Sequence, residues 1–248
     1  MLKGWIDVKL YVGTSGYAYK EWKGIFYPDK ISPKEMLRFY SERLGTVEIN
    51  NTFYHMPTRR LLSSWAEKVP VDFIFAVKAP QVITHLKLLR NVGEETDYFF
   101  GTLSVLGKQL GPVLFQFPKS FLINGPQFKD FLSLIPGMVS CAFEFRNLSW
   151  YTAEILDLLR QKGCSLCITD ADENPANEII KTAPWGYLRL RRTDYVYTDL
   201  LQWRERIRSQ KWEKAFVFFK HEDEAQGPAN ALRFHELSDS RITKIQHH

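Results

Sequence analysis

Eight short runs rich in β-branched or aromatic residues recur along the chain, each followed by polar or turn residues. The segments between them repeat apolar residues with the period of a helix. Alternating strands and helices indicate parallel strands, because a crossover helix carries the chain back to begin the next strand at the same edge. The eight runs are Tyr11–Ser15, Thr46–Asn50, Phe73–Lys78, Val113–Phe117, Val139–Arg146, Ser165–Asp170, Gly186–Arg191 and Ala215–Lys220.

Eight strand–helix units in 248 residues match a closed barrel, which takes about 250 residues, better than an open doubly wound sheet. No linker or low-complexity run divides the chain. We therefore predict an α/β fold: one (β/α)8 TIM-barrel domain over residues 1–248. The sixth connection, Ala171–Pro184, leaves room for about two helical turns, so we expect a short sixth helix there.

Composition excludes several classes of protein. Hydrophobic residues make up 45% and charged residues 25%, which excludes a disordered or collagen-like chain. Three cysteines are too few for a disulfide scaffold. No apolar run approaches the length of a membrane span, and the first residues lack the apolar core of a signal peptide. We expect a soluble, cytoplasmic protein with no membrane partner, and the sequence leaves its oligomeric state open.

Several predicted strands are apolar on one face and polar on the other. Alternate residues of a barrel strand face the interior and the helices. Because the apolar faces can pack against helices, we expect the polar faces inside, near the C-terminal strand ends where barrel active sites lie. Glu48, Lys78, Glu144 and Arg189 should therefore converge inside the barrel, and Asp170 is expected to join them. The other inward polar residues are Asn50, Gln116, Arg146 and Arg191.

Two interpretations of this polar interior stay open. A mutually compensating ion network could simply fill the barrel, although an unpaired buried ion costs several kcal/mol. Alternatively, the charges line an open cavity that binds a polar or anionic ligand. The net charge of +5 favours anionic partners, and the chain has no block of five basic residues typical of a nucleic-acid-binding tail.

Successive short motifs resemble one family in order along nearly the whole chain. They are Gly13-Thr14-Ser15-Gly16-Tyr17, Val47-Glu48-Ile49-Asn50-Asn51-Thr52-Phe53-Tyr54, Phe75-Ala76-Val77-Lys78, Leu114-Phe115-Gln116-Phe117-Pro118, Glu144-Phe145-Arg146 with Ser149-Trp150, and Tyr187-Leu188-Arg189-Leu190. This series resembles the YecE-like family, catalogued as domain of unknown function 72. The resemblance implies a TIM barrel and no established activity. It marks as signature polar positions Glu48, Asn50, Lys78, Gln116, Glu144, Arg146 and Arg189.

The chain departs from the family pattern at late positions. Arg191-Arg192 stands where the family tends to have His-Gly, Lys220-His221 where it tends to have Asn-Asn, and Asn147 replaces a usual His. These changes make the pocket more basic than the resemblance implies.

Smaller signals add candidates around the barrel mouth. His85, after the third strand, is the best lone candidate for an acid or base near neutral pH, and a plain surface histidine is an equally open interpretation. Ser15 could touch a ligand. Aromatic rings in the upper loops could stack on a sugar or nucleobase, or could merely staple the loops. These rings are Tyr17, Tyr19, Trp22, Phe26, Tyr27, Trp150, Tyr195 and Tyr197.

A metal site is the less favoured interpretation of the acidic residues. Glu48, Glu144, Asp170 and His221 carry oxygen and nitrogen donors at different strand ends. The neighbouring lysine and arginines already supply the positive charge that a metal would bring. We therefore predict that no metal and no other cofactor is required.

Two functional hypotheses follow. The first is a metal-independent hydrolase, lyase or isomerase acting on a small anionic or polyhydroxylated, sugar- or nucleotide-like substrate. Its acid–base residues would be Glu48, Glu144, Asp170 and His85, and its binding residues Ser15, Tyr17, Asn50, Lys78, Gln116, Arg146, Trp150, Arg189 and Arg191. The second is an RNA- or nucleotide-binding module without catalysis. A deep pocket with perturbed pKa values favours the enzyme, and an open basic groove favours the binding module.

Overall fold

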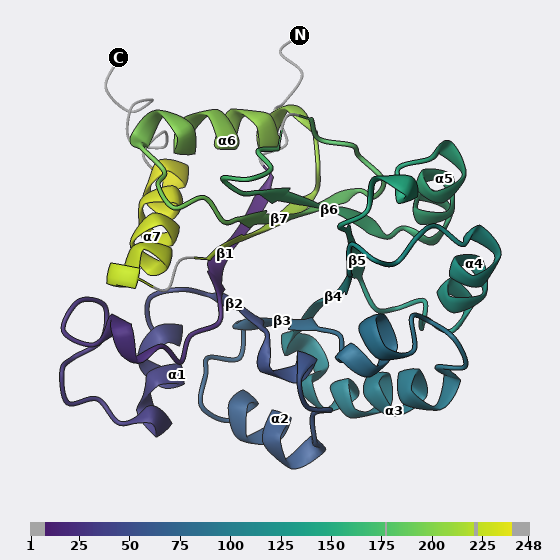
Figure 1. Cartoon of the computed structure of the whole chain (residues 1–248). Coiled ribbons are helices and arrows are strands. Elements are labelled where there is room, and N and C mark those ends of the chain that lie inside the picture. Colours follow the sequence, from purple (N-terminus) through teal and green to yellow (C-terminus); the bar gives the residue numbers. More distant parts are fainter. Residues whose placement is uncertain (1–7, 177, 221–222, 240–248) are drawn as a thin grey trace, which may run out of the picture.

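Eight parallel strands close into a barrel in the order of the sequence, with helices around it (Figure 1). The computed structural model describes residues 8–176, 178–220 and 223–239. The strands are β1 (Lys9–Ser15), β2 (Thr46–Ile49), β3 (Ile74–Lys78), β4 (Leu110–Phe117), β5 (Cys141–Phe145), β6 (Ser165–Asp170), β7 (Trp185–Leu190) and β8 (Lys214–Phe219). The predicted TIM-barrel fold is confirmed.

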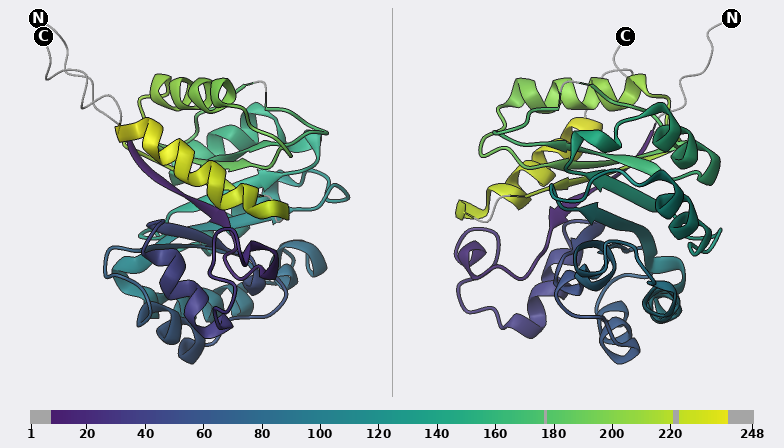
Figure 2. Two further views of the ribbon diagram at one scale, coloured as in Figure 1. Left: turned by 90° about the vertical axis from the view of Figure 1, so that its left-hand side faces the viewer. Right: turned by 45° about the vertical axis from the view of Figure 1, so that its right-hand side comes forward.

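The longer helices follow their strands and cover the outside of the barrel. They are α1 (Pro33–Ser41), α2 (Arg59–Ala66), α3 (Gly93–Leu103), α4 (Gly125–Ser133), α5 (Ala153–Lys162), α6 (Tyr197–Ser209) and α7 (Gln226–Asp239). The last helix, α7, lies across β1 on the outside of the barrel, where the first and last strands pair (Figure 2). No helix in the described part of the chain is both long and apolar enough to span a membrane.

Side-chain caps fix where several of these helices begin. The Ser32 N–H donates to Glu35 Oε2 at 3.2 Å, as the capping-box pattern of the sequence predicts. Thr58 accepts a hydrogen bond from the N–H of Leu61 at the start of α2, and Thr152 caps α5 in the same way. Each cap satisfies a backbone N–H that has no partner inside its helix.

The predicted short sixth helix is wrong. Residues 171–176 and 178–184, which connect β6 to β7, form a turn followed by irregular structure, without a helix. Ala171 and Asn174 exchange backbone hydrogen bonds, and Asp170 Oδ1 accepts from the N–H of Ala176 at 3.0 Å. These bonds occupy groups that a helix would need, and Pro175 disfavours helical geometry at the residue before it.

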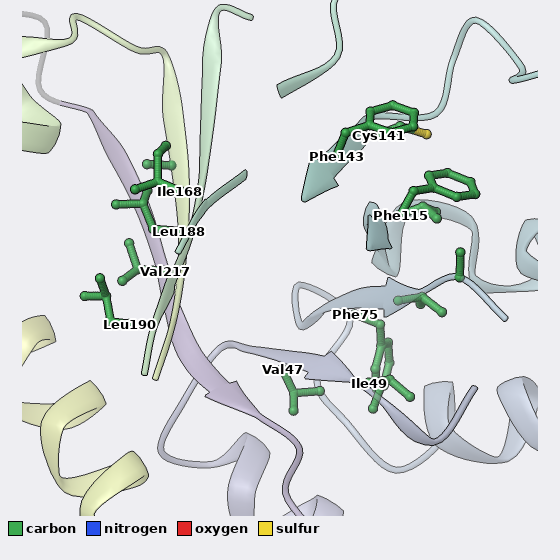
Figure 3. Packing of buried hydrophobic residues seen from close by; sticks show 14 of the residues in the cluster. Val47, Ile49, Phe75, Phe115, Cys141, Phe143, Ile168, Leu188, Leu190 and Val217 are labelled. Atoms are coloured by element: carbon green, nitrogen blue, oxygen red, sulfur yellow. The ribbon is translucent and has the colours of Figure 1, made fainter. Parts of the chain in front are cut away.

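Two separate apolar clusters lie on opposite faces of the strands. The larger lies between the barrel and its helices and contains the residues labelled in Figure 3, among them Val47, Phe75 and Leu188. The smaller fills the lower barrel interior and includes Ala76, Leu114, Ala142, Tyr187 and Phe218. Apolar side chains therefore fill much of the lower barrel interior, and the buried charged side chains lie toward its C-terminal end.

Candidate functional site

An ion cluster links three strands inside the barrel. Arg189, at the end of β7, places Nη2 3.0 Å from Glu48 Oε1 of β2 and Nη1 2.7 Å from Glu144 Oε2 of β5. All three side chains are buried, with at most 6% exposed. The predicted convergence is confirmed for Glu48, Glu144 and Arg189.

Further donors hold Glu48. Tyr187, one inward position below Arg189 on β7, donates its hydroxyl to Glu48 Oε2 at 2.8 Å. Asn50 donates from Nδ2 to Glu48 Oε1 at 3.0 Å. Sequence reasoning did not select Tyr187 as a site residue, although it shares the strand face of Arg189 and Arg191. Together these contacts fix the Glu48 carboxylate as an acceptor of several hydrogen bonds.

Both carboxylates stay ionised at neutral pH. Burial alone would raise the pKa of each, but Arg189 outweighs burial and the pKa of Glu48 falls below its usual value. The pKa of Glu144 falls to about 2, with Arg146 adding to the effect of Arg189. A carboxyl group that remains ionised cannot donate a proton, so this geometry favours roles as anchors and acceptors for Glu48 and Glu144.

Lys78 has an unusual position for a buried amine. The residue is only 9% exposed, and its Nζ donates to Gln116 Oε1 at 2.9 Å and lies 4.0 Å from the centre of the Phe53 ring. Within the described residues, no carboxylate lies within ion-pair distance of this amine. Burial, followed by the charge of Arg189, lowers the pKa of Lys78 to about 8. Lys78 therefore can exchange a proton near neutral pH.

His85 packs on the same aromatic ring as Lys78. It belongs to a short π-helical turn, Val82–Leu86, and its ring and that of Phe53 are T-shaped, with 4.8 Å between their centroids. The Thr84 hydroxyl lies 2.8 Å from His85 Nδ1. Burial, with the charges of Lys78 and Arg146, lowers the pKa of His85 to about 4. The imidazole is therefore neutral at physiological pH, although its unperturbed pKa would not ensure this.

Two further arginines lie at the upper edge of the ion cluster. Arg146 is partly exposed and holds its Nε 3.4 Å from Glu144 Oε1. Arg191 follows β7 and is half-buried, and burial together with Arg189 lowers its pKa. The C-terminal end of the barrel thus brings together the carboxylates of Glu48 and Glu144 and four basic side chains, those of Lys78, Arg146, Arg189 and Arg191.

Several buried donors in this region lack a protein partner. The Nε atoms of Arg189 and Arg191 are buried and make no hydrogen bond within the described residues. Ser15 Oγ and Gln116 Nε2 likewise make none of normal geometry, although they are close enough to Glu48 and Glu144 to lower the pKa of those groups. A buried donor without a partner is uncommon in a folded protein and points to a ligand or ordered water.

Asp170 does not belong to this cluster, contrary to the sequence-based prediction. Its position on β6 shares the parity of Ile168, so the side chain faces the helix layer. Its Oδ2 accepts hydrogen bonds from Tyr195 at 2.8 Å and from Trp203 of α6 at 3.2 Å, and pairs with Arg192 at 3.0 Å. Through these contacts Asp170 connects the barrel to α6. The alternation rule, applied to this strand, would have shown the error.

The aromatic rings of the upper loops mostly pack inward. Trp150 is fully buried, stacks on Phe145 at 4.9 Å, and donates its Nε1 to the carbonyl oxygen of Phe121. It is therefore not available to a substrate, and that prediction is wrong. Tyr17 is half-buried, with its ring 6.3 Å from that of Tyr40. Of the eight rings that the sequence suggests, only Tyr197 is largely exposed.

The donor set considered for a metal is not assembled in the described structure. Asp170 faces the helices, and His221 lies outside the described residues. Across residues 8–176, 178–220 and 223–239, no group of three or more His, Cys, Asp or Glu side chains is placed to hold a metal ion. That no metal and no other cofactor is required stays a prediction to be tested.

A separate hollow of about 800 Å3 lies at the opposite, N-terminal end of the barrel. Its walls include Tyr11 and Phe216, whose rings stack 4.7 Å apart. None of the residues in the ion cluster lines it. Barrel enzymes carry their active sites at the C-terminal strand ends, so the ion cluster is the better candidate site.

Comparison with known proteins supports the fold and the family. The chain is 24% identical to the UPF0759 protein YunF of Bacillus subtilis, over 93% of this chain and 95% of that protein. It is 25% identical to the UPF0759 protein YecE of Escherichia coli K12, over 70% of this chain and 65% of that protein.

Solved structures agree with this relationship. A DUF72 family protein from Thermotoga maritima is 28% identical, with a TM-score of 0.80 over 92% of this chain and 98% of that one. A DUF72 family protein from Enterococcus faecalis, 20% identical, has a TM-score of 0.72 over 93% and 98% of the two chains and supports the fold alone. The model of the DUF72 family, described as protein of unknown function DUF72, matches residues 11–247 of this chain. The chain therefore belongs to the DUF72 family.

Proposed function

We propose that this protein is an enzyme that binds a small anionic substrate at the C-terminal end of the barrel and carries out acid–base chemistry on it. The observation that carries the proposal is the surplus of buried positive charge. Arg189 and Arg146 together balance the charges of Glu48 and Glu144, so the charges of Lys78 and Arg191 are not balanced by a carboxylate in ion-pair contact. An anion would supply the missing charge.

The buried donors define what the anion would contact. Arg189 and Arg191 each keep an Nε donor without a protein partner. A guanidinium group binds carboxylate or phosphate through a planar pair of donors. The ligand therefore carries one of these groups, held beside Arg191 at the edge of the cluster. Barrels also commonly bind phosphate near the ends of strands seven and eight.

Lys78 is the group best suited to move a proton. A general acid–base catalyst is most effective when its pKa lies near the working pH. The pKa of Lys78 is about 8, whereas Glu144 at about 2 and His85 at about 4 lie well below neutrality. The carboxylates Glu48 and Glu144 then orient Arg189, and His85 serves as a neutral hydrogen-bonding group.

Anion binding is tested by thermal melting with inorganic phosphate, glucose 6-phosphate or uncharged glucose, at constant ionic strength. We expect the two phosphates to raise the melting temperature and glucose to leave it unchanged, because only bound ligands stabilise the folded state. Arg191→Gln should lose most of the shift. The matched control is Arg160→Gln, which alters an exposed pair with Asp157 on α5 and should keep it. No shift in the wild type, or equal shifts in both variants, would refute the anion site.

Catalysis is tested by incubating the protein in deuterated water with a panel of phosphorylated and carboxylated carbonyl compounds. Proton transfer at carbon replaces hydrogen by deuterium, which NMR detects directly. We expect exchange with at least one member of the panel and none with Lys78→Met, which should retain the phosphate-induced melting shift at reduced size. Binding without exchange across the whole panel would leave an anion-binding module and contradict the enzyme.

A further inference from the structure

The surroundings of the Lys78 amine also suit a nucleophile. A lysine that reacts as a nucleophile must lose its proton, and it does so readily when desolvated or placed next to another cation. Lys78 meets both conditions, because it is 9% exposed and shares the barrel interior with Arg189. Its hydrogen-bond acceptor, Gln116 Oε1, is neutral. Losing the proton therefore breaks no ion pair.

The two carboxylates that could have paired with Lys78 are already engaged. Arg189 binds both Glu48 and Glu144, and Arg146 adds a second contact to Glu144. A lysine amine in a carboxylate pair stays protonated, because the opposite charge favours its cationic form. In this barrel Arg189 pairs with the carboxylates instead. The Lys78 amine lies beside the face of the Phe53 ring and the side-chain amide of Gln116.

From this geometry we infer that Lys78 forms a covalent imine with the carbonyl carbon of a small substrate that also carries a carboxylate or phosphate group. The inference rests on the proposed anion site, because Arg191 and the free Nε of Arg189 would hold the anionic group while the carbonyl meets Nζ. It names the substrate class as anionic carbonyl compounds, such as 2-oxo acids or phosphorylated aldehydes and ketones.

The step balances without an oxidant or metal. The neutral amine attacks the carbonyl carbon, a C–N bond forms, and the carbonyl oxygen takes up the proton that nitrogen loses. The C–O bond of this carbinolamine then breaks, its oxygen leaves as water after accepting one further proton, and the nitrogen lone pair completes the C=N bond. One amine, one carbonyl and one proton give one protonated imine and one water. The cationic imine keeps the charge that protonated Lys78 carried.

His85 is placed to assist this exchange of protons. Its ring and the Lys78 amine contact the same aromatic side chain, Phe53. Thr84 occupies Nδ1, which leaves Nε2 for another partner. A neutral imidazole can relay a proton between nitrogen and oxygen without adding a further positive charge beside Lys78, Arg146 and Arg189. His85 is therefore assigned as a positioning and relay group.

Reductive trapping tests the imine. The wild-type protein is treated with pyruvate, glyoxylate or uncharged acetone, each with sodium cyanoborohydride at neutral pH, and digested for peptide mapping. Cyanoborohydride reduces an imine to a stable secondary amine, which mass spectrometry locates. We expect labelling at Lys78 by the two acids and little by acetone. Lys78 should be labelled on the order of a hundred times faster than an exposed lysine. The reason is that its pKa of about 8 leaves a larger fraction of its amine neutral at this pH than in an exposed lysine, by about that factor.

Two variants and a competitor sharpen the test. Lys78→Arg should lose the label, whereas Lys108→Arg, at an exposed position before β4, should keep it. Inorganic phosphate should slow labelling of Lys78 if it occupies the anion site. Since the wild-type peptide map by itself locates the adduct, the test does not depend on whether Lys78→Arg folds.

The outcomes separate this inference from the proposed function. Labelling at Lys78 that phosphate suppresses supports both. A phosphate-induced melting shift without preferential labelling at Lys78 overturns the imine and leaves the anion site intact. Labelling of Lys78 equally by acetone and pyruvate overturns the assignment of anionic carbonyl compounds as the substrate class.

Discussion

Replacing Arg189 by methionine tests the central feature of the barrel interior. The substitution keeps most of the side-chain volume and removes the guanidinium that lies between Glu48 and Glu144. Two buried carboxylates then lose their main partner in the same step. Breaking a buried ion pair by removing one member costs about 3–5 kcal/mol, because the other charge is left uncompensated. We expect a loss of folding stability of at least this order at neutral pH.

The pKa of Glu144 gives a second route to the magnitude. Folding lowers this pKa from 4.5 to about 2, and each unit corresponds to about 1.4 kcal/mol, so the ionised carboxylate contributes roughly 3 kcal/mol. A depressed pKa contributes stability above the unfolded value. In the wild type that contribution is present above about pH 4.5 and is lost as the pH falls toward about 2.

Arg189→Met should reverse this pH dependence. Without the guanidinium, burial dominates and raises the pKa of Glu48 and Glu144 above their unfolded values. A raised carboxyl pKa destabilises the fold at pH values above it, and protonation relieves that penalty. The stability difference between wild type and variant should therefore be largest at neutral pH and shrink below about pH 5.

Urea unfolding followed by circular dichroism and fluorescence measures both effects, with agreement of the two signals as the check on two-state behaviour. Arg38→Met is the matched control, since it removes an exposed pair with Glu42 at 3.6 Å and should change stability by less than about 1 kcal/mol. The triple variant Arg189→Met with Glu48→Gln and Glu144→Gln should recover stability. A loss below about 1 kcal/mol, or one independent of pH, would refute the reasoning.

Four further outcomes follow from the same contacts. Asp170→Asn should destabilise the protein by about 1–3 kcal/mol, because its acceptor oxygen contacts Tyr195 and Trp203, yet leave the phosphate-induced melting shift unchanged; loss of that shift would return Asp170 to the site. Tyr187→Phe should cost about 1.5–3 kcal/mol in denaturant unfolding by removing a donor to the Glu48 carboxylate, and a neutral result would mean that this hydrogen bond contributes nothing net. NMR titration of His85 should show no protonation above about pH 5, since its pKa is about 4; a midpoint near 6.5 would contradict its burial beside Lys78. Calorimetric affinity for phosphate should weaken as the pH rises through about 8, where Lys78 loses its charge, and Lys78→Met should remove that dependence; an unchanged pH profile would exclude Lys78 from the anion site.

The strand pattern of the sequence determined the architecture and the convergence of the main charges. Period-two alternation placed Glu48, Lys78, Glu144 and Arg189 on the inward faces, because the apolar residues between them had to meet the helices. The same rule explains the one charged residue that was misplaced. Asp170 shares the parity of Ile168, so alternation itself assigns it to the helix layer.

Other features were settled only by packing between distant segments. Whether Trp150 would meet a ligand depended on Phe145, which stacks on its ring, and on Phe121, whose carbonyl oxygen accepts its N–H. The missing sixth helix depended on backbone and Asp170 contacts that compete with helical hydrogen bonds. The sequence shows which aromatic and polar residues are present, but the burial of their side chains depends on which other segments pack against them.

The chemical character of Lys78 is the clearest case of a property that the sequence could not determine. Alternation places its side chain inside the barrel, but a lysine beside Glu48 and Glu144 could equally have formed an ordinary ion pair. Arg189, from a strand more than a hundred residues away, takes both carboxylates. A pKa depends on the distances and burial of all neighbouring charges, so only the closed barrel decides that the arginine is paired and the lysine is not.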